Sequence, residues 1–586
     1  MSYNVIGISA FYHDSACCII QDGKLIAAVQ EERFSRKKND PDLPKKAFLY
    51  CLEVAGISID DVDCIGYYEN PTKKISRQLW SGNHQLSIQS AMEIDPNYPV
   101  QSIRSQLGYD GPVKIFDHHQ SHAASSFYFS GFDEAAIMTV DGVGEWATTT
   151  YGKGDGTKLE ILEEVNFPDS IGMLYSTLTS FMGFKVNSGE YKVMGLAPYG
   201  EPKFVEQVRE MITLKENGQY ELNMKYFDFL KGERMYSDEI VPLFGLEPRE
   251  KETEILQVHK DIAKSLQVVL EEVLINKATY VQKLTGSKNL CMAGGVALNC
   301  VANGKILKES PFDKLFVQPA SNDAGCALGA AVLAYLEIGG TMKSNKLPHV
   351  YLGPEYSSAE IENLLGATSL KYKNFQGKRD ERMAEIVNRL SNGKVIGWFS
   401  GRMEFGPRSL GARSILADPR RPEMRDLINA MVKKREGFRP FAPAVLNDYK
   451  DDHFLIDHES PFMLETCQVK SELDLPAITH VDGSARVQTV TRETNPEFAA
   501  LLEAFNSATG CPILLNTSFN VRDEPIVCSP EDAIRCFITT NIDCLVLGDF
   551  LLDKEENDLI MLNMINTNLV SNKGDFEINP SVYTFI

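Results

Sequence analysis

The segment Ala135-Ala136-Ile137-Met138-Thr139-Val140-Asp141-Gly142-Val143-Gly144-Glu145 decides the fold. Its first six residues predict a buried strand that ends in an aspartate and a glycine-rich turn, and the threonine-rich run Ala147–Tyr151 predicts the returning strand. The chain opens on the same plan, because Asn4–Ser9 and Ser15–Ile20 predict two strands joined by a polar turn. Two copies of one hairpin indicate a duplicated α/β domain with a nucleotide between its halves.

Two histidines precede this segment, in the run Asp117-His118-His119-Gln120-Ser121-His122-Ala123. At i, i+4 spacing on a helix, His118 and His122 point both rings to one side, as a shared metal ion requires. Asp141, at the carboxyl end of the strand, offers a carboxylate beside them, and Asp323, which opens a helix of small residues, could bring a second. Two histidines with one or two carboxylates and open positions suit a catalytic iron, manganese or zinc ion. The alternative is a pair of ordinary histidines, but three of the ten histidines fall within these five residues.

Length and composition indicate an ordinary globular protein of at least two domains. The chain has 586 residues, 43% hydrophobic and 24% charged, and no apolar run approaches the length of a membrane span. The amino-terminal residues do not predict a signal peptide, and the twelve cysteines lack CxxC spacing, so we expect reduced thiols and a cytoplasmic location. A linker near residue 345 predicts two domains, 1–345 and 346–586.

The charges of the chain indicate which partners it can bind. A net charge of -21 disfavours nucleic acid as the main partner. Cations nevertheless crowd into residues 402–439, among glycines, prolines and phenylalanines, and guanidinium groups bind phosphate or carboxylate oxygens bidentately. This cluster predicts an anion site, with solvated surface charge as the alternative. The cations selected for the phosphates are Arg408, Arg413, Lys434, Arg435 and Arg439.

Several turns predict ligand contacts. Residues 170–200 look too irregular for a plain helix and predict a site-forming loop. A glycine pair, Gly294-Gly295, at a strand-to-helix turn lets backbone approach a ligand. The run Asn516-Thr517-Ser518-Phe519-Asn520 follows a buried strand and offers amides and hydroxyls. Residues 253–285 predict a long amphipathic helix whose exposed face allows a homodimer.

Six of these motifs, taken in order, closely resemble the O-carbamoyltransferases of the nodulation and antibiotic-tailoring group, which includes the tobramycin and cephamycin carbamoyltransferases. The resemblance covers nearly the whole chain, and several independent motifs agree. They are His13-Asp14-Ser15-Ala16, His118-His119-Gln120-Ser121-His122-Ala123, Lys192-Val193-Met194-Gly195-Leu196-Ala197, Gly294-Gly295-Val296-Ala297-Leu298-Asn299, Gly406-Pro407-Arg408-Ser409-Leu410-Gly411 and Leu515-Asn516-Thr517-Ser518-Phe519-Asn520.

The resemblance implies an amino-terminal domain of the actin and sugar-kinase superfamily, like the tRNA-threonylcarbamoylation ATPase, and a YrdC-like carboxyl-terminal domain. It implies that carbamoyl phosphate and ATP, which Mg²⁺ can accompany, give carbamoyl adenylate in the second domain. The carbamoyl group then passes to a hydroxyl of a small natural product, such as an antibiotic or toxin, at an iron site, or a manganese or zinc site, in the first. Enclosing both sites in one chain would keep water from the intermediate.

The resemblance also assigns roles. It makes His118, His122, Asp141 and Asp323 the metal ligands and His13 the general base, although His13 could instead be a solvated turn residue. The residues expected to line the nucleotide, the phosphates and the carbamoyl group are Glu190, Lys192, Gly294, Gly295, Asn299, Arg408, Arg413, Lys434, Arg435, Arg439, Asn516, Ser518 and Asn520.

Two other functions stay open. Both halves resemble the tRNA threonylcarbamoylation pathway, which the acidic charge disfavours. The third hypothesis is an actin-like ATP-binding module without transfer activity. The sequence does not reveal the acceptor, whose contacts depend on loops such as 70–100 and 203–250.

Overall fold

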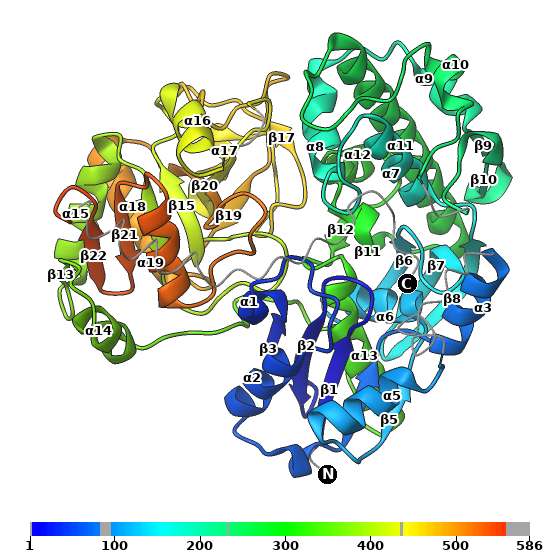
Figure 1. Cartoon of the computed structure of the whole chain (residues 1–586), viewed down its shortest axis with the longest axis horizontal. Coiled ribbons are helices and arrows are strands. Elements are labelled where there is room, and N and C mark those ends of the chain that lie inside the picture. Colours follow the sequence, from blue (N-terminus) through cyan, green and yellow to red (C-terminus); the bar gives the residue numbers. More distant parts are fainter. Residues whose placement is uncertain (1–2, 82–94, 231–233, 434–436, 558–586) are drawn as a thin grey trace. The chain divides into compact units, whose positions relative to one another are not determined.

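The computed structural model describes residues 3–81, 95–230, 234–433 and 437–557 (Figure 1). The chain forms two compact units. The first contains the chain up to Glu31 and Asn39–Leu347, and the second contains Glu32–Lys38 and the chain from Pro348. Residues 32–38 lie within the predicted 1–345 domain, but they pack with the second unit because Arg33 donates to the carbonyl of Gly406 at 2.8 Å. Lys434 and Arg435 lie outside the described residues.

The first unit contains two five-stranded sheets of the same order. In each sheet the first three strands along the chain form an antiparallel meander. The first of these strands also pairs in parallel with a fourth, which pairs in parallel with a fifth. The orders are β3-β2-β1-β4-β5 and β8-β7-β6-β11-β12. The duplicated domain predicted from the two hairpins is therefore confirmed, and so is the actin and sugar-kinase fold that the family resemblance implies. The strands are β1 Asn4–Ser9, β2 Ala16–Gln21, β3 Lys24–Gln30, β4 Cys64–Tyr67, β5 Val113–Ile115, β6 Glu134–Val140, β7 Ala147–Asp155, β8 Lys158–Asn166, β11 Asn289–Ala293 and β12 Lys314–Val317.

Two helices lie between these sheets. Helix α13 (Asp323–Glu337) packs on β1, β2 and β4, helix α6 (His118–Phe127) packs on β6 and β11, and the two helices pack on each other (Figure 1). The small residues of α13 permit this, because a Cβ on Gly7 of β1 would lie 1.9 Å from the carbonyl oxygen of Ala327. The first sheet thus presses directly on the α13 backbone.

The remaining helices and two short strands of the first unit surround the two sheets or connect their strands. Helix α2 packs on β2 and β3, while α11, the predicted long helix, packs on β6 and β7. The expectation that residues 170–200 form an irregular loop is wrong, since α7 and α8 occupy most of it. These elements are α2 Lys45–Ala55, α3 Pro71–Ser81, α5 Tyr98–Ser102, α7 Ile171–Phe181, α8 Glu190–Leu196, α9 Val205–Glu210, β9 Ile212–Leu214, β10 Tyr220–Leu222, α10 Ile240–Phe244, α11 Gln257–Thr285 and α12 Cys300–Glu309.

The second unit is a mixed α/β fold around an eight-stranded sheet of the described chain, ordered β13-β22-β21-β14-β15-β20-β16-β19. Its core surrounds Trp398 on β14, which is completely buried. The likeness of this unit to a YrdC domain stays a prediction. Its strands are β13 Lys373–Asn374, β14 Ile396–Phe399, β15 Arg413–Ala417, β16 Ala442–Leu446, β17 Cys467–Gln468, β18 Ser484–Ala485, β19 Gln488–Val490, β20 Ile513–Ser518, β21 Cys544–Leu547 and β22 Phe550–Asp553.

Helix α19 of the second unit begins at a serine cap followed by a proline. Ser529 accepts from the amide of Asp532 and Pro530 is the first residue of α19, as a helix start requires. Among the described residues, none of the helices is long and apolar enough to cross a membrane. These helices are α1 Glu32–Ser35, α14 Ser358–Gly366, α15 Arg379–Ser391, α16 Glu423–Ile428, α17 Lys450–His453, α18 Pro496–Thr509 and α19 Pro530–Thr539.

Candidate metal centre

Helix α6 presents its histidines to the end of the central strand β6. The helix begins at His118, whose backbone amide donates to Glu145 Oε1 at 2.8 Å. Glu145 thereby satisfies an amide that the first turn leaves without an intrahelical partner. One turn later His122 places its ring 4.7 Å from that of His118, measured between ring centroids. The predicted i, i+4 pair therefore lies on one face.

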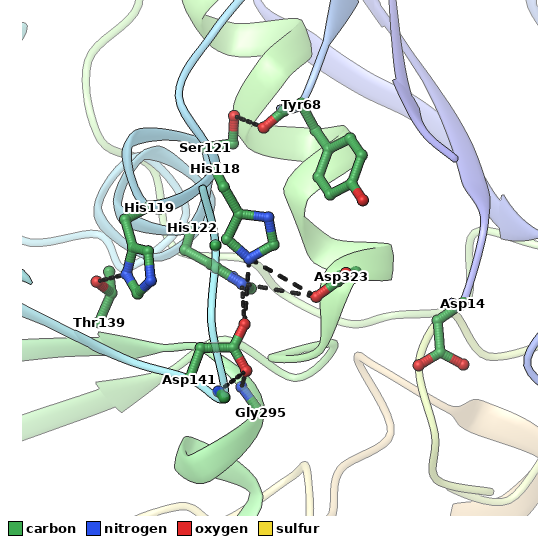
Figure 2. A network of polar contacts seen from close by, with 12 residues as sticks. Asp14, Tyr68, His118, His119, Ser121, His122, Thr139, Asp141, Gly295 and Asp323 are labelled. Carbon is green, nitrogen blue, oxygen red and sulfur yellow. Dashed lines mark hydrogen bonds and ion pairs between the residues drawn. The ribbon is translucent and has the colours of Figure 1, made fainter. Parts of the chain in front are cut away.

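Two aspartates from other elements meet this pair (Figure 2). Asp141 follows β6, and its Oδ2 lies 3.1 Å from Nε2 of His118 and 3.2 Å from Nε2 of His122. Asp323 opens α13, and its Oδ1 lies 3.8 and 3.9 Å from the same two nitrogens. All four ligand atoms lie within 4.8 Å of one another. We call these four residues the metal centre.

The orientation of Asp141 is held by backbone amides. Its Oδ1 accepts from Gly142 at 2.8 Å and from Gly295 at 3.1 Å, which leaves Oδ2 directed at the histidines (Figure 2). Gly294 has a φ of 95°, and a Cβ there would lie 2.2 Å from the carbonyl oxygen of Val140. The glycine pair thus lets this turn approach the end of β6 closely enough to orient the carboxylate.

The donor set fits a divalent transition metal. Ligands about 2.1 Å from a tetrahedral ion lie about 3.4 Å apart, and the four nitrogen–oxygen distances here run from 3.1 to 3.9 Å. Two imidazoles and two carboxylates suit iron, manganese or zinc. Cys326, one turn after Asp323, also lies near the histidines, but burial raises the pKa of its thiol well above the usual value, which favours the carboxylate set.

The site concentrates negative charge in a buried setting. Burial alone would raise the pKa of Asp141, but hydrogen bonds with His118 and His122 hold it well below its ordinary value. Burial would lower the pKa of His118, yet Asp323 and Asp141 raise it to about 9. The carboxylates thus draw a proton onto the His118 ring, and a bound cation would take over this compensation.

His13 lies at the edge of the metal centre. Its Nδ1 is 3.1 Å from Asp14 Oδ2 and 3.8 Å from Asp323 Oδ2. Burial would lower its pKa, but Asp323, Asp14 and Asp141 raise it to about 10. Both carboxylates face Nδ1, so they orient the ring. The turn therefore does bring this histidine to the metal centre.

The third histidine of the run points elsewhere. His119 directs Nδ1 to the hydroxyl of Thr139 at 2.6 Å, away from the two aspartates (Figure 2). Burial, with the neighbouring histidines, lowers its pKa well below the ordinary value, so it stays neutral. His119 therefore does not belong to the metal centre.

The residues expected to line the nucleotide come from helix α8 and from the segment between β11 and α12. Glu190 is half-buried and accepts from Ser176 Oγ at 2.8 Å, and burial raises its pKa. Lys192 places Nζ 5.8 Å from the ring centroid of Phe184. Asn299 caps α12 and exchanges hydrogen bonds with Gln267 at 3.0 and 3.1 Å. Of this group, Gly294 and Gly295 reach the metal centre.

In the second unit, Arg413 is committed to the protein itself. Its Nη1 donates to Gly401 O at 2.9 Å, its Nη2 donates to Pro354 O at 2.9 Å, and the guanidinium lies 3.6 Å from the ring centroid of Phe399. It is completely buried, and burial lowers its pKa. Arg408 and Arg439, by contrast, are partly exposed.

The polar turn after β20 is ordered by its own side chains. Ser518 donates to Asn520 Oδ1 at 2.7 Å, and Asn520 Nδ2 donates to Glu524 O at 2.7 Å. Asn516 is buried on β20 and donates to Gln488 Oε1 at 2.8 Å. The three predicted residues therefore lie along one strand end.

Sequence reasoning missed a buried carboxylate beside the motif of residues 406–411. Glu404 Oε1 accepts from the amides of Leu410 and Ala412, both at 2.7 Å, and thus shapes the arginine-bearing turn. It also missed Glu145 at the start of α6 and Gln488 beside Asn516. For Glu145 a signal existed, because it directly follows the glycine turn that Asp141 opens; nothing in the local pattern marks the other two.

Two family models match the chain. One described as "Carbamoyltransferase N-terminus" matches residues 4–332, and one described as "Carbamoyltransferase C-terminus" matches residues 387–554. The chain therefore belongs to the carbamoyltransferase family, and it is an enzyme that transfers carbamoyl groups.

Several relatives are similar to this chain over most of its length. Nodulation protein NolNO of Sinorhizobium fredii is 40% identical over 93% of this chain and 80% of its own length. The 3'-hydroxymethylcephem-O-carbamoyltransferase of Amycolatopsis lactamdurans is 29% identical over 93% of this chain and 98% of its own length. An uncharacterized protein of Synechocystis is 44% identical over 94% of this chain and 97% of its own.

Solved structures show more distant similarity. The ROK hexokinase of Thermus thermophilus is 15% identical, with a TM-score of 0.30 over 57% of this chain and 99% of the hexokinase. HypF of T. kodakarensis is 14% identical, with a TM-score of 0.31 over 58% of this chain and 48% of HypF. The fold of the first unit rests on its strand order and not on these scores.

Proposed function

We propose that this enzyme is an ATP-dependent O-carbamoyltransferase of a small, hydroxylated natural product. Carbamoyl phosphate, ATP and water give carbamoyl adenylate, phosphate and pyrophosphate in the second unit. The acceptor oxygen then bonds to the carbamoyl carbon at the metal centre, the carbon–oxygen bond to AMP breaks, and the hydroxyl proton leaves. The observation that carries this proposal is the convergence of His118, His122, Asp141 and Asp323 in a member of this family.

The metal centre is the proposed site at which the carbamoyl carbonyl is polarised. A ferrous ion, or manganese or zinc in its place, would be held by the four residues and would polarise the carbamoyl carbonyl as a Lewis acid. The backbone amides of Gly142 and Gly295 keep Asp141 directed inward, so the donor set is prepared before a ligand arrives. Burial of the two imidazoles keeps water from competing.

His13 is the proposed base for the acceptor hydroxyl. Asp14 and Asp323 both face Nδ1, so they hold the ring with Nε2 directed elsewhere. Among the described residues Nε2 takes no hydrogen bond. A cation bound by Asp141 and Asp323 would offset the carboxylate charge that raises the pKa of this ring, so that Nε2 could receive the hydroxyl proton. The two carboxylates then stabilise the imidazolium that forms.

For the second unit, the proposed anion site combines Arg408 and Arg439 with Lys434 and Arg435. The amides and hydroxyls of Asn516, Ser518 and Asn520 would orient the carbamoyl and ATP groups, with Mg²⁺ accompanying ATP. Arg413 is left out of this set, because its donors already bind backbone carbonyls. Glu190, Lys192 and Asn299 remain proposed contacts of the nucleotide in the first unit.

Two assays test the proposal. The intact chain with Mg²⁺-ATP should release pyrophosphate only when carbamoyl phosphate is added. Mass spectrometry of candidate hydroxylated metabolites, incubated with ATP, carbamoyl phosphate and ferrous or manganous ion, should then show an added carbamoyl group. Intact, metal-loaded protein that released no pyrophosphate would remove the proposal.

A further inference from the structure

Two buried side-chain amides meet on two strands of the second unit that flank a third strand. Gln488 on β19 and Asn516 on β20 are 2% and 1% exposed, and Asn516 Nδ2 donates to Gln488 Oε1 at 2.8 Å. Both strands pair with β16, which lies between them in the sheet. The two side chains therefore meet above this central strand.

The orientation of both amides is fixed by backbone carbonyls. Gln488 Nε2 donates to the carbonyl of Leu410 at 2.7 Å, and a carbonyl can only accept. The other end of the Gln488 amide, Oε1, must therefore face Asn516. Asn516 Nδ2 donates to this oxygen and also to Ser409 O, which is 3.4 Å away. Flipping either amide would set acceptors against acceptors.

This arrangement leaves two buried atoms without partners among the described residues. They are Asn516 Oδ1 and the hydroxyl oxygen of Ser409, which is itself 4% exposed. Leaving a buried acceptor unsatisfied destabilises a fold, so such an atom calls for a donor, which a bound ligand can supply. The site presents one strict acceptor beside one hydroxyl that can donate.

We propose that Gln488 is a positioning residue that holds Asn516 so that its Oδ1 accepts from the amino group of the carbamoyl substrate. Ser409 then donates to the carbamoyl carbonyl. This inference rests on the proposed function, and it adds a source of selectivity: acetyl phosphate has the same shape but carries a methyl group where carbamoyl phosphate carries NH₂. A site built to bond an N–H rejects an analogue that lacks it.

The turn from Gly406 to Gly411 carries Ser409. Neither partnerless atom touches solvent, so a ligand that reaches them must displace part of the surrounding protein. These two glycines have φ values of 115° and 99°, a region that other residues rarely adopt. Arg408 lies on the same turn, which brings a cation to the phosphate end of the substrate.

The experiment compares binding of carbamoyl phosphate and acetyl phosphate to the intact protein by calorimetry at low temperature. The unaltered chain should prefer carbamoyl phosphate by at least about tenfold, the equivalent of one good hydrogen bond. Gln488→Met frees the Asn516 amide to rotate. The two compounds should then bind with about equal affinity, and the affinity for acetyl phosphate should be unchanged. Thr489→Ser is the matched control, since it alters the next residue of β19 and keeps the hydroxyl that accepts from Ser460.

A purely structural role for Gln488 would weaken both ligands equally, and that result would overturn the inference. So would a preference that survives in Gln488→Met. If that variant does not fold, Asn516→Ala takes its place and should likewise abolish the preference without loss of acetyl phosphate binding. Failure of the unaltered chain to bind either compound would contradict the proposed function itself, whereas equal binding of both would contradict only the role of Asn516.

Discussion

Gly329 of α13 and Ser121 of α6 meet through their backbones: a Cβ on Gly329 would lie 1.8 Å from the carbonyl oxygen of Ser121. This contact sets the separation of the two helices that carry Asp323 and the histidine pair. Residues far apart in sequence reach one metal centre because a glycine lets the helices touch.

Gly329→Ala should therefore damage the metal centre without altering any ligand. The added methyl group overpacks the helix contact, which costs about 1–3 kcal/mol of unfolding free energy, and displaces Asp323 from the histidines. Thermal unfolding and a ferrous or zinc titration measure the two effects, and we expect metal affinity to fall at least about tenfold. Gly366→Ala, at the last residue of α14 where a Cβ meets nothing within 4 Å, should leave both unchanged. A stable Gly329→Ala protein with full metal affinity would contradict the role given to this contact.

His118→Ala should separate the two proposed half-reactions. Removing a direct ligand should weaken metal binding by more than about 100-fold, since loss of an outer partner alone costs up to that much. Carbamoyl-phosphate-dependent pyrophosphate release, which we assign to the second unit, should persist while product formation stops. His259→Gln is the control, because His259 accepts from Leu256 N at the start of α11, away from the four proposed ligands. Unchanged metal content in His118→Ala would refute the ligand assignment.

Patterns within short stretches of sequence predict individual strands, hairpins and helices. The two hairpins and the histidine spacing follow from apolar runs and helical periodicity, and each is present. Residues 170–200 escape this kind of prediction because their glycines resemble loop signals. Gly172 instead lies inside α7, where a Cβ would meet the carbonyl oxygen of Asp141 at 2.6 Å. There a glycine marks close packing rather than a turn.

The candidate site shows the same limit. The convergence of Asp323 with the histidines depends on a helix contact, so the family resemblance and the small residues of α13 predict it, whereas spacing does not. Arg413 belongs to a cation-rich run, yet its guanidinium is buried among carbonyls. Residue type indicates which groups an arginine could bind, but tertiary packing decides which it meets.

Lys277 of α11 provides a test of buried charge outside the metal centre. It is completely buried, donates to Tyr151 Oη at 2.8 Å, and burial lowers its pKa well below the ordinary value. The unfolded chain then binds a proton that the folded chain does not, so this lysine lowers stability at neutral pH and the loss shrinks as pH rises. Relative to that of Lys277→Met, the free energy of unfolding of the unaltered protein should rise by at least about 1.4 kcal/mol between pH 7 and pH 10. This is the equivalent of one pKa unit.

Chemical denaturation at several pH values measures this difference. Tyr151 keeps its own hydrogen bond to Gly218 O at 2.7 Å in the variant, so its hydroxyl proton stays paired. Lys283→Met, on the exposed side of the same helix, should shift stability by less than about 0.5 kcal/mol at any pH. A pH-independent difference between the unaltered protein and Lys277→Met would show that Lys277 is charged in the folded state.

His458 in the second unit should give the opposite pH dependence. Its Nε2 lies 2.9 Å from Glu465 Oε1, and this carboxylate, with Asp457, raises its pKa from 6.5 to about 9 although burial opposes the shift. A folded pKa above the unfolded one adds stability that is fully present below pH 6.5 and is lost as pH rises through about 9. Glu465→Gln should therefore destabilise the protein at pH 6 and match it at pH 10. Since the histidine side chain is 40% exposed, solvent screening limits the effect to about 1 kcal/mol or less. Equal melting temperatures at pH 6 would mean that the pair contributes nothing, and a gap that widened toward pH 10 would contradict the expected sign.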